Sequence, residues 1–252
     1  MSDRDEEDSI NSEEDDPPIG ILVVNPNTTK EITDALQPAL ESLGYDEVEF
    51  TYFTAPSGPA SIDSNADANA SAKHCLPHLI PMLADHDAVL VACYSSHPLV
   101  IQLKEKTDIP IISILEASVL AALPLLTTSY KDPSAPTSRF GIVSTGKIWS
   151  GLLPDAIEEF LGGPSARFAG VETTGMSAGE LHKLNTTEVQ SRMVTATQKL
   201  MKRGGVDVIL LGCAGMVGLE EVVRAAAGEG TFVVDGAKAA VGILVGLVKA
   251  DF

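Results

Sequence analysis

The chain has 252 residues, of which 44% are apolar and 21% charged; this composition predicts a soluble globular protein and excludes a disordered one. With 35 acidic and 17 basic residues the net charge is −18, so we expect neither nucleic acid nor a membrane as partner. No apolar run reaches transmembrane length, and the acidic N-terminus does not resemble a signal sequence. Three cysteines are too few for a disulfide framework, which predicts a cytoplasmic protein.

The first 16 residues differ in composition from the rest of the chain. They contain nine acidic residues and a single basic one, Arg4, and they are followed by Pro17 and Pro18. Such acid runs are usually solvated, so we interpret residues 1–16 as a disordered acidic tail. A partner-binding arm is the alternative interpretation.

From Gly20 onward, apolar runs rich in β-branched residues alternate with amphipathic helical stretches. Strands are predicted at 21–24, 48–53, 88–93, 109–114, 140–144, 166–172, 206–213 and 231–235. Helices are predicted at 30–43, 64–83, 187–203 and 219–227, and an exposed loop at 131–138. Nearly continuous apolar strands are typical of parallel sheets covered on both faces, so the pattern predicts an α/β fold with parallel sheets.

The chain contains an internal repeat centred on two cysteines. The segment from Asp87 to Cys93 (DAVLVAC) aligns with the segment from Asp207 to Cys213 (DVILLGC). The strand end at Asn25 lies 68 residues before Cys93, and the strand end at Ser144 lies 69 before Cys213. Two pseudo-symmetric halves follow from this spacing. Since ligands of open α/β sheets bind at the carboxyl ends of strands, both cysteines are predicted to border one cleft between the lobes.

Two thiols facing each other across a cleft suit one kind of reaction. A carbon acid bound between them can lose a proton to one sulfur and regain one from the other, which inverts the stereocentre. A following helix N-terminus would favour the thiolate at Cys93 and Cys213. Buried core cysteines are the alternative reading, and this is the one we adopt for Cys75, which has no counterpart in the repeat.

Four segments resemble the hydantoin racemase branch of the aspartate/glutamate racemase superfamily: VVNPNTT (23–29), GPASIDS (58–64), ILLGCAGM (209–216) and VVDGAKAA (233–240). The resemblance spans residues 19–248. It implies two flavodoxin-like lobes, an interlobe active-site cleft and racemisation by Cys93 and Cys213 with no cofactor and no metal. It also implies two crossings between lobes, with the first lobe at 17–102 plus 222–252 and the second at 103–221.

The resemblance favours a neutral cyclic ureide, such as a 5-substituted hydantoin or allantoin, as the substrate. Glutamate racemases have Thr-His where this chain has Ala214-Gly215, and Asp-Ser-Gly where it has Asn25-Pro26-Asn27; both changes disfavour a free amino acid. Bacterial hydantoin racemases have Cys-Phe-Gly-Asp-Pro where this chain reads CYSSHP (93–98).

Removing the C5 proton of a hydantoin creates an enolate, so hydrogen-bond donors must point at its oxygen. The candidate substrate-binding residues are Asn25, Ser61, Tyr94, Ser95, Ser144, Thr145, Ala214 and Gly215.

Other interpretations stay open from the sequence. Another superfamily reaction (amino-acid racemisation, decarboxylation or cis-trans isomerisation) or a non-catalytic binding protein would use the same cleft. His74 and His78 lie four residues apart on a predicted helix, but a surface face is favoured over a zinc site. His97 could tune Cys93 or start a helix, and Asp235 could orient the cleft or cap a helix. A homo-oligomer is expected.

Overall fold

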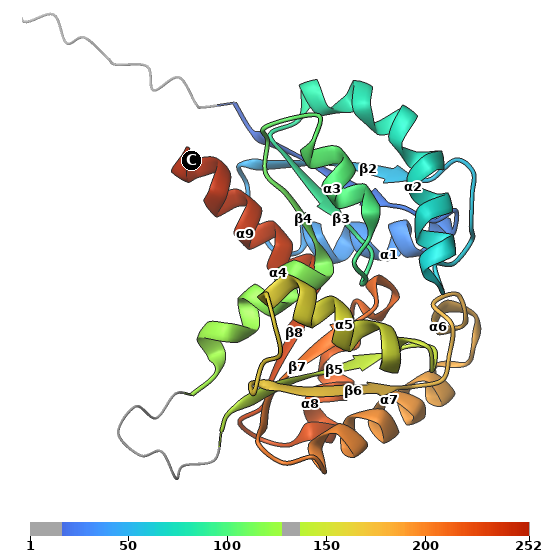
Figure 1. Ribbon diagram of the computed structural model, residues 1–252, viewed down its shortest axis with the longest axis vertical. Coiled ribbons are helices and arrows are strands. Elements are labelled where there is room, and N and C mark those ends of the chain that lie inside the picture. Colours follow the sequence, from blue (N-terminus) through green and yellow to red (C-terminus); the bar gives the residue numbers. More distant parts are fainter. Residues whose placement is uncertain (1–16, 128–136, 252) are drawn as a thin grey trace, which may run out of the picture.

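The computed structural model describes residues 17–127 and 137–251, and its strands form two four-stranded parallel sheets (Figure 1). The first sheet has the order β2-β1-β3-β4, and its strands are β1 (Ile19–Asn25), β2 (Val48–Thr54), β3 (Ala88–Val91) and β4 (Ile111–Ser113). The second has the order β6-β5-β7-β8, and its strands are β5 (Arg139–Ser144), β6 (Phe168–Thr173), β7 (Val206–Gly212) and β8 (Phe232–Asp235). The two orders are the same with four added to each number, which confirms the predicted pair of α/β lobes.

Helices connect successive strands of both sheets. Those that follow the strands of the first sheet are α1 (Lys30–Glu41), α2 (Asn65–Leu79), α3 (Pro98–Lys104) and α4 (Ile114–Ala122). Those that follow the strands of the second are α5 (Trp149–Leu161), α6 (Glu180–Lys183), α7 (Thr186–Met201), α8 (Glu220–Ala227) and α9 (Gly236–Ala250). Short 3-10 turns add η1 (Ile80–Asp85), η2 (Leu123–Leu125) and η3 (Ala214–Met216).

The predicted elements correspond closely to those in the structure, with one helix divided. The stretch 64–83 is α2 followed by η1, in which Pro81 occupies one of the first positions. Proline has no N–H group to donate, which interrupts the α-helical hydrogen bonds there. The predicted acidic tail at 1–16 and most of the loop predicted at 131–138 lie outside the described residues.

Two strands lie in sheets other than those expected from the lobe boundaries. Residues 111–113 were expected in the second lobe but pair with β3 of the first sheet, and residues 232–235 were expected in the first lobe but pair with β7 of the second. Each sheet thus completes its fourth strand before the chain crosses over. Helix α9 then packs against α1, α4 and β3, so the C-terminal helix does return to the first lobe.

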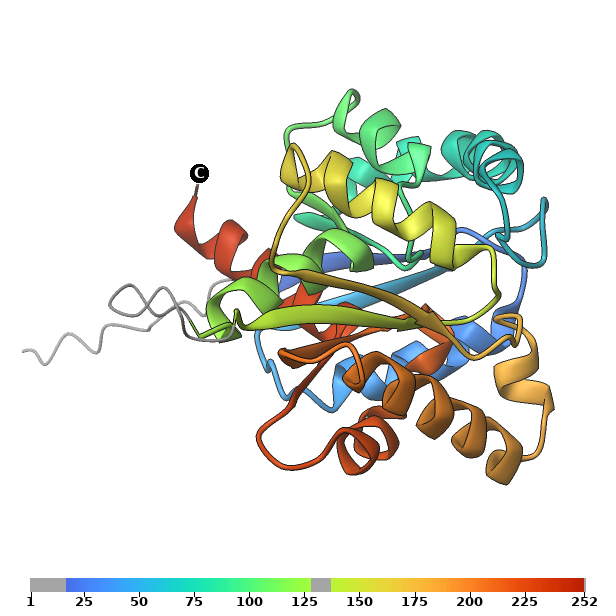
Figure 2. The same cartoon turned by 60° about the horizontal axis from the view of Figure 1, so that its bottom comes forward.

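Alternating side chains on the strands divide the core into three layers. Ile21 of β1 and Ile142 of β5 both belong to one large apolar cluster, which also contains residues of α1, α4, α5 and α9. Leu22 faces α2 and α3 on the opposite side of the first sheet, and Val143 faces α7 and α8 on the opposite side of the second. Figure 2 shows α5 and α7 on opposite faces of the second sheet. The two lobes therefore share the central layer of their core.

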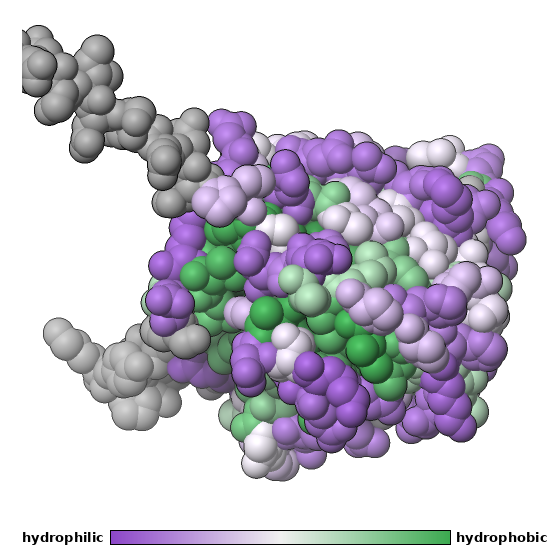
Figure 3. All heavy atoms as spheres, turned by 90° about the horizontal axis from the view of Figure 1, so that it is seen from above, coloured by the Kyte–Doolittle hydropathy of each residue, from purple (hydrophilic) through white to green (hydrophobic). Residues whose placement is uncertain are grey.

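The surface at one end of the molecule is mixed in polarity. Figure 3 shows one end of the molecule, where hydrophilic residues surround a band of apolar ones. Within residues 17–127 and 137–251, no helix is long and apolar enough to cross a membrane.

Candidate active site

The two cysteines of the repeat border one cavity. Cys93 lies two residues after the end of β3, and Cys213 follows directly after β7, so each lies at the carboxyl end of a central strand. The cavity has a volume of about 40 Å³. Its described lining consists of Asn27, Ile32, Ile62, Asp63, Ala92, Cys93, Tyr94, Thr145, Trp149, Ala178, Gly212, Cys213 and Ala214. Both lobes contribute to it.

Burial determines the protonation of both sulfurs. Burial raises the pKa of the Cys93 thiol to about 11. A hydrogen bond with the Ser95 hydroxyl, 3.2 Å from the sulfur, lowers this pKa but does not offset the effect of burial. Burial raises the pKa of Cys213 to about 12, and the backbone N–H of Gly215 partly offsets this. The negative charge of Asp63 raises the pKa of both thiols. At neutral pH both cysteines are therefore protonated.

This protonation differs from the thiolate that the sequence led us to expect. The prediction relied on helix N-termini close to the sulfurs, but α3 begins only at Pro98 and α8 only at Glu220, and the element that directly follows Cys213 is the three-residue 3-10 turn η3. The helix dipole acts within about one turn, so it is weak at that separation. The desolvation of the buried sulfurs exceeds what remains of it.

Three of the predicted binding residues line the cavity together with the cysteines: Tyr94, Thr145 and Ala214. The Tyr94 hydroxyl pairs with the Ser118 hydroxyl at 2.8 Å, and burial raises its pKa. No described residue forms a hydrogen bond with the Thr145 hydroxyl, although its carbonyl accepts one from Gly175. A donor remains available at Thr145.

The other five predicted binding residues do not line the cavity. Asn25 donates to the Thr29 carbonyl and the Thr33 hydroxyl, each at 3.0 Å, which fixes the turn after β1. Ser144 donates to the Gly212 carbonyl at 2.8 Å and joins β5 to β7. Ser61 has a buried hydroxyl without a partner among the described residues. Ser95 and Gly215 contact the site through the cysteines, since the Ser95 hydroxyl pairs with Cys93 and the Gly215 N–H donates to Cys213.

Sequence reasoning missed Asn27, Asp63 and Trp149, which the structure places on the cavity wall. Asn27 and Asp63 lie inside two of the segments that resemble the racemases, NPNTT and GPASIDS, so the signal for them was present. Trp149 also lines a neighbouring pocket of about 110 Å³ that contains Ser95 and Ser96. It is therefore shared between the cavity of the cysteines and this neighbouring pocket.

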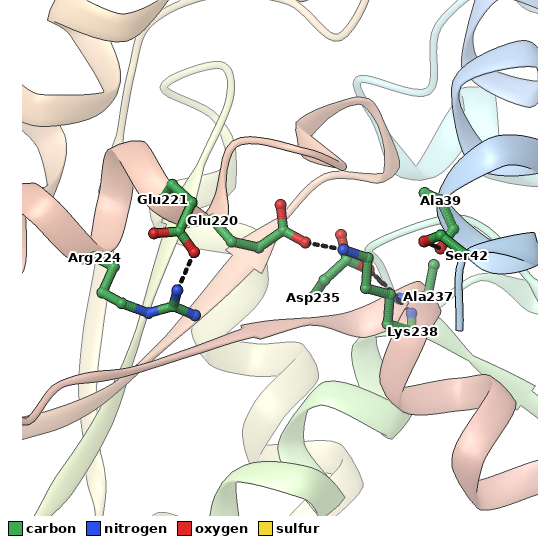
Figure 4. A network of polar contacts seen from close by, with 8 residues as sticks. All are labelled: Ala39, Ser42, Glu220, Glu221, Arg224, Asp235, Ala237 and Lys238. Atoms are coloured by element: carbon green, nitrogen blue, oxygen red, sulfur yellow. Dashed lines mark hydrogen bonds and ion pairs between the residues drawn. The ribbon is translucent and has the colours of Figure 1, made fainter. Parts of the chain in front are cut away.

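The two residues whose role the sequence left open, His97 and Asp235, are both helix caps. His97 is the N-cap of α3, since its Nδ1 accepts the Leu99 N–H at 3.2 Å, and burial lowers the pKa of its ring to about 4. The Asp235 carboxylate accepts the N–H groups of Ala237 and Lys238 at the start of α9 (Figure 4). In the same figure the Lys238 ammonium forms an ion pair with Glu220. Neither His97 nor Asp235 lines the cavity of the cysteines.

One of the two histidines weighed for a metal site has a protein partner. The His74 ring pairs with the Ser57 hydroxyl at 2.9 Å. Cys75 is fully buried against the first sheet, and its sulfur lies 3.7 Å from the Pro26 carbonyl oxygen. Among residues 17–127 and 137–251, no three histidine, cysteine or acidic side chains are grouped as a metal site requires.

The fold and the cavity define a two-lobed α/β protein in which equivalent strands each bring a cysteine to one cavity. The family described as Asp/Glu/hydantoin racemase matches residues 21–244, and the chain belongs to this family of isomerases.

Three relatives locate the chain within the family. It is 34% identical over 238 residues to an uncharacterised protein of Schizosaccharomyces pombe, covering 92% of this chain and 93% of the relative. It is 28% identical over 198 residues to a hydantoin racemase of a Pseudomonas species, covering 78% and 73% of the two chains. The crystal structure of an allantoin racemase from Pseudomonas fluorescens superposes with a TM-score of 0.81 at 27% identity, covering 93% and 92%. These likenesses support the hydantoin and allantoin racemase branch.

Proposed function

We propose that this protein racemises 5-substituted hydantoins, with allantoin as a candidate substrate, by two-base proton transfer between Cys93 and Cys213. One observation carries the proposal: equivalent strands of two pseudo-symmetric lobes bring a thiol each to the same cavity. A pair of acid–base groups related by pseudo-symmetry suits a reaction whose substrate and product are mirror images.

The chemistry needs one sulfur on each face of the ring. The C5 hydrogen of a hydantoin is acidified by the adjacent C4 carbonyl, so a thiolate on one face removes it and leaves an enolate. The thiol on the opposite face then gives its proton to C5, which inverts the centre and transfers the negative charge to that sulfur. Tyr94, Thr145 and Ala214 line the cavity, and the Thr145 hydroxyl and the backbone N–H groups at Tyr94 and Ala214 are the candidate donors to the enolate oxygen.

Two features of the cavity bear on the catalytic cycle. With thiol pKa values of about 11 and 12, the reactive form with one thiolate is a minor species at neutral pH. A volume of about 40 Å³ also holds roughly three waters at ~10–15 Å³ each, less than a substituted hydantoin requires. Binding must therefore enlarge the cavity, and Trp149, which also lines the neighbouring pocket of about 110 Å³, is the residue through which the two spaces could join.

Solvent-deuterium exchange tests this proposal directly. The purified protein is incubated in D₂O with allantoin, alkyl hydantoins, aspartate and glutamate, and exchange at the acidic carbon is followed by NMR, with chiral chromatography to score inversion. We expect exchange with inversion for a cyclic ureide and none for the two amino acids. Exchange with aspartate or glutamate, or with none of the four, would contradict the proposal.

A further inference from the structure

We propose that Asp63 determines the substrate class by accepting a hydrogen bond from the ring N–H bonded to the reacting carbon. This inference rests on the proposed function, because it takes the reacting carbon to lie between Cys93 and Cys213. It assigns a specificity role to a residue in the loop between β2 and α2.

The loop holds Asp63 in a fixed position. The Asp67 carboxylate accepts the backbone N–H of Asp63 at 3.2 Å and the Ser64 hydroxyl at 2.7 Å. The Ser64 hydroxyl in turn accepts the N–H of Asp67 at 3.1 Å and caps α2. The Asp63 side chain is thus presented to the cavity by a pre-organised turn and does not depend on a mobile tip.

The Asp63 carboxylate has no partner among the residues that the structure describes. It lines the cavity, yet no residue in the described part of the chain donates a hydrogen bond to it or pairs with it as a cation. No lysine, arginine or histidine is among the described lining residues. A carboxylate in a partly desolvated position is costly when it lacks donors, so a ligand that brings an N–H group gains from binding there.

The carboxylate lies close to the centre of reaction. It lines the same cavity as both sulfurs, and its charge raises the pKa of both thiols. In a hydantoin, C5 has two ring neighbours, N1 and the C4 carbonyl carbon. N1–H is therefore the ureide donor nearest to Asp63, whereas N3–H lies on the opposite side of the ring.

Asn27 supplies the complementary group. Its Oδ1 accepts the Thr29 N–H at 2.9 Å, which identifies the other atom of the amide as the NH₂ group. No described residue accepts a hydrogen bond from that NH₂ group. Asn27 and Asp63 thus offer one donor and one acceptor on the same cavity wall, which matches the carbonyl and the N–H that flank C5.

A free α-amino acid fits this arrangement less well. Its α-ammonium group could donate to Asp63, but it also brings a carboxylate directly beside the reacting carbon, and the described lining has no basic residue to pair with that carboxylate. A carboxylate that is desolvated without a cation is costly. The cavity therefore favours a molecule that has an N–H group adjacent to the reacting carbon and no carboxylate on that carbon.

Binding of three small probes tests this role without relying on turnover. Hydantoin, 1-methylhydantoin and 3-methylhydantoin are achiral at C5, so titration calorimetry measures their affinity with no net reaction. For the wild-type protein, methylation at N1 should weaken binding about tenfold to a hundredfold more than methylation at N3, the range of a hydrogen bond to a charged acceptor. In Asp63→Ala this N1 preference should disappear, because the acceptor is gone.

Two further variants separate the role of Asp63 from general effects. Asp63→Asn keeps the shape of the side chain and one acceptor oxygen, so it should reduce the N1 preference without abolishing it. This variant also tests the role of Asp63 if the alanine variant does not fold. Asp85→Asn removes the same charge from an exposed position in η1 and should keep the full preference.

The outcomes distinguish this inference from the proposed function. If Asp63→Ala keeps the N1 preference, or if wild-type protein shows none, the role of Asp63 is wrong even when racemisation occurs. If the preference depends on Asp63 but no hydantoin exchanges its C5 hydrogen, the proposed reaction fails and the binding specificity stands. Aspartate or glutamate binding as tightly as hydantoin would also overturn the assignment.

Discussion

Each cysteine in the proposed reaction serves one enantiomer as the base and the other as the acid. In Cys93→Ser and in Cys213→Ser, net inversion should fall by about two orders of magnitude or more, because a serine hydroxyl ionises far less readily than a thiol. The remaining cysteine can still deprotonate the enantiomer that it faces. Each variant should therefore keep some exchange without inversion, and the two should prefer opposite enantiomers, as measured by NMR in D₂O with chiral chromatography.

Cys75 supplies the matched control for these variants. It is the third cysteine of the chain, fully buried in the first lobe and absent from the cavity lining. Cys75→Ser should change exchange and inversion by no more than a few fold. If Cys75→Ser were the inactive variant, or if both other variants exchanged the same enantiomer, the two-thiol mechanism would be wrong.

The raised thiol pKa values predict how the rate depends on pH. Burial keeps Cys93 and Cys213 protonated, with pKa values of about 11 and 12, and the base form is the thiolate. Raising the pH toward these values increases the fraction with one thiolate, so kcat/KM should rise by about tenfold per pH unit between pH 6 and 9. Initial rates corrected for the uncatalysed reaction measure this slope, and a flat profile would mean that the thiolate is already stabilised.

At the scale of elements, the sequence predicted most of what the structure contains. Continuous apolar strands and the repeat around Cys93 and Cys213 were enough to predict two equivalent parallel sheets, because both signals are local in the chain. The predicted assignment of residues 111–113 and 232–235 to lobes was wrong. The sheet that each short strand joins depends on which sheet edge it meets in the folded chain. No local pattern encodes that choice.

The side chains around the cavity were harder to predict than the strands. Asn25 and Ser144 were selected because they end equivalent strands, but their short side chains reach neighbouring backbone groups first. Asp63 comes from a loop whose position depends on the cap formed by Ser64 and Asp67. Tertiary packing decides which polar side chains keep an unpaired donor or acceptor facing the cavity. A single sequence does not show this packing.

The contact between α9 and α4 depends on a glycine. A Cβ added at Gly236 would lie 2.3 Å from the Ile114 carbonyl oxygen, so alanine would force the first residues of the two helices apart. Gly236→Ala should lower the free energy of unfolding by about 1–3 kcal/mol, the usual cost of overpacking. Urea denaturation followed by circular dichroism measures this change.

A second glycine of α9 provides the comparison. Gly246 is exposed, and an added Cβ would meet nothing within 4 Å. Gly246→Ala should raise the free energy of unfolding by about 0.5–1 kcal/mol, because alanine favours the helix. Equal effects of the two substitutions would show that the close approach at Gly236 does not matter to stability.

At the scale of the whole molecule, the two lobes are joined through their cores. One apolar cluster contains Ile21 and Leu90 from the first sheet and Phe140 and Leu210 from the second. Helix α4 contacts β4 of the first sheet and both β7 and β8 of the second, and it also packs along α9. Separating the lobes would expose this layer, so neither lobe retains a complete core without the other. The predicted homo-oligomer and cytoplasmic location stay predictions at this scale.

The shared core predicts that the lobes unfold together. Exposing the central cluster costs free energy at about 25 cal/mol per Å² of apolar surface, which penalises a state with one lobe folded. Calorimetry should show a single transition with a calorimetric-to-van't Hoff enthalpy ratio near one, and Gly236→Ala should shift this transition without splitting it. Trp149, the single tryptophan, lies in the shared cluster. Its fluorescence and the far-UV circular dichroism should therefore change at the same urea concentration, whereas separate midpoints would show that the lobes unfold independently.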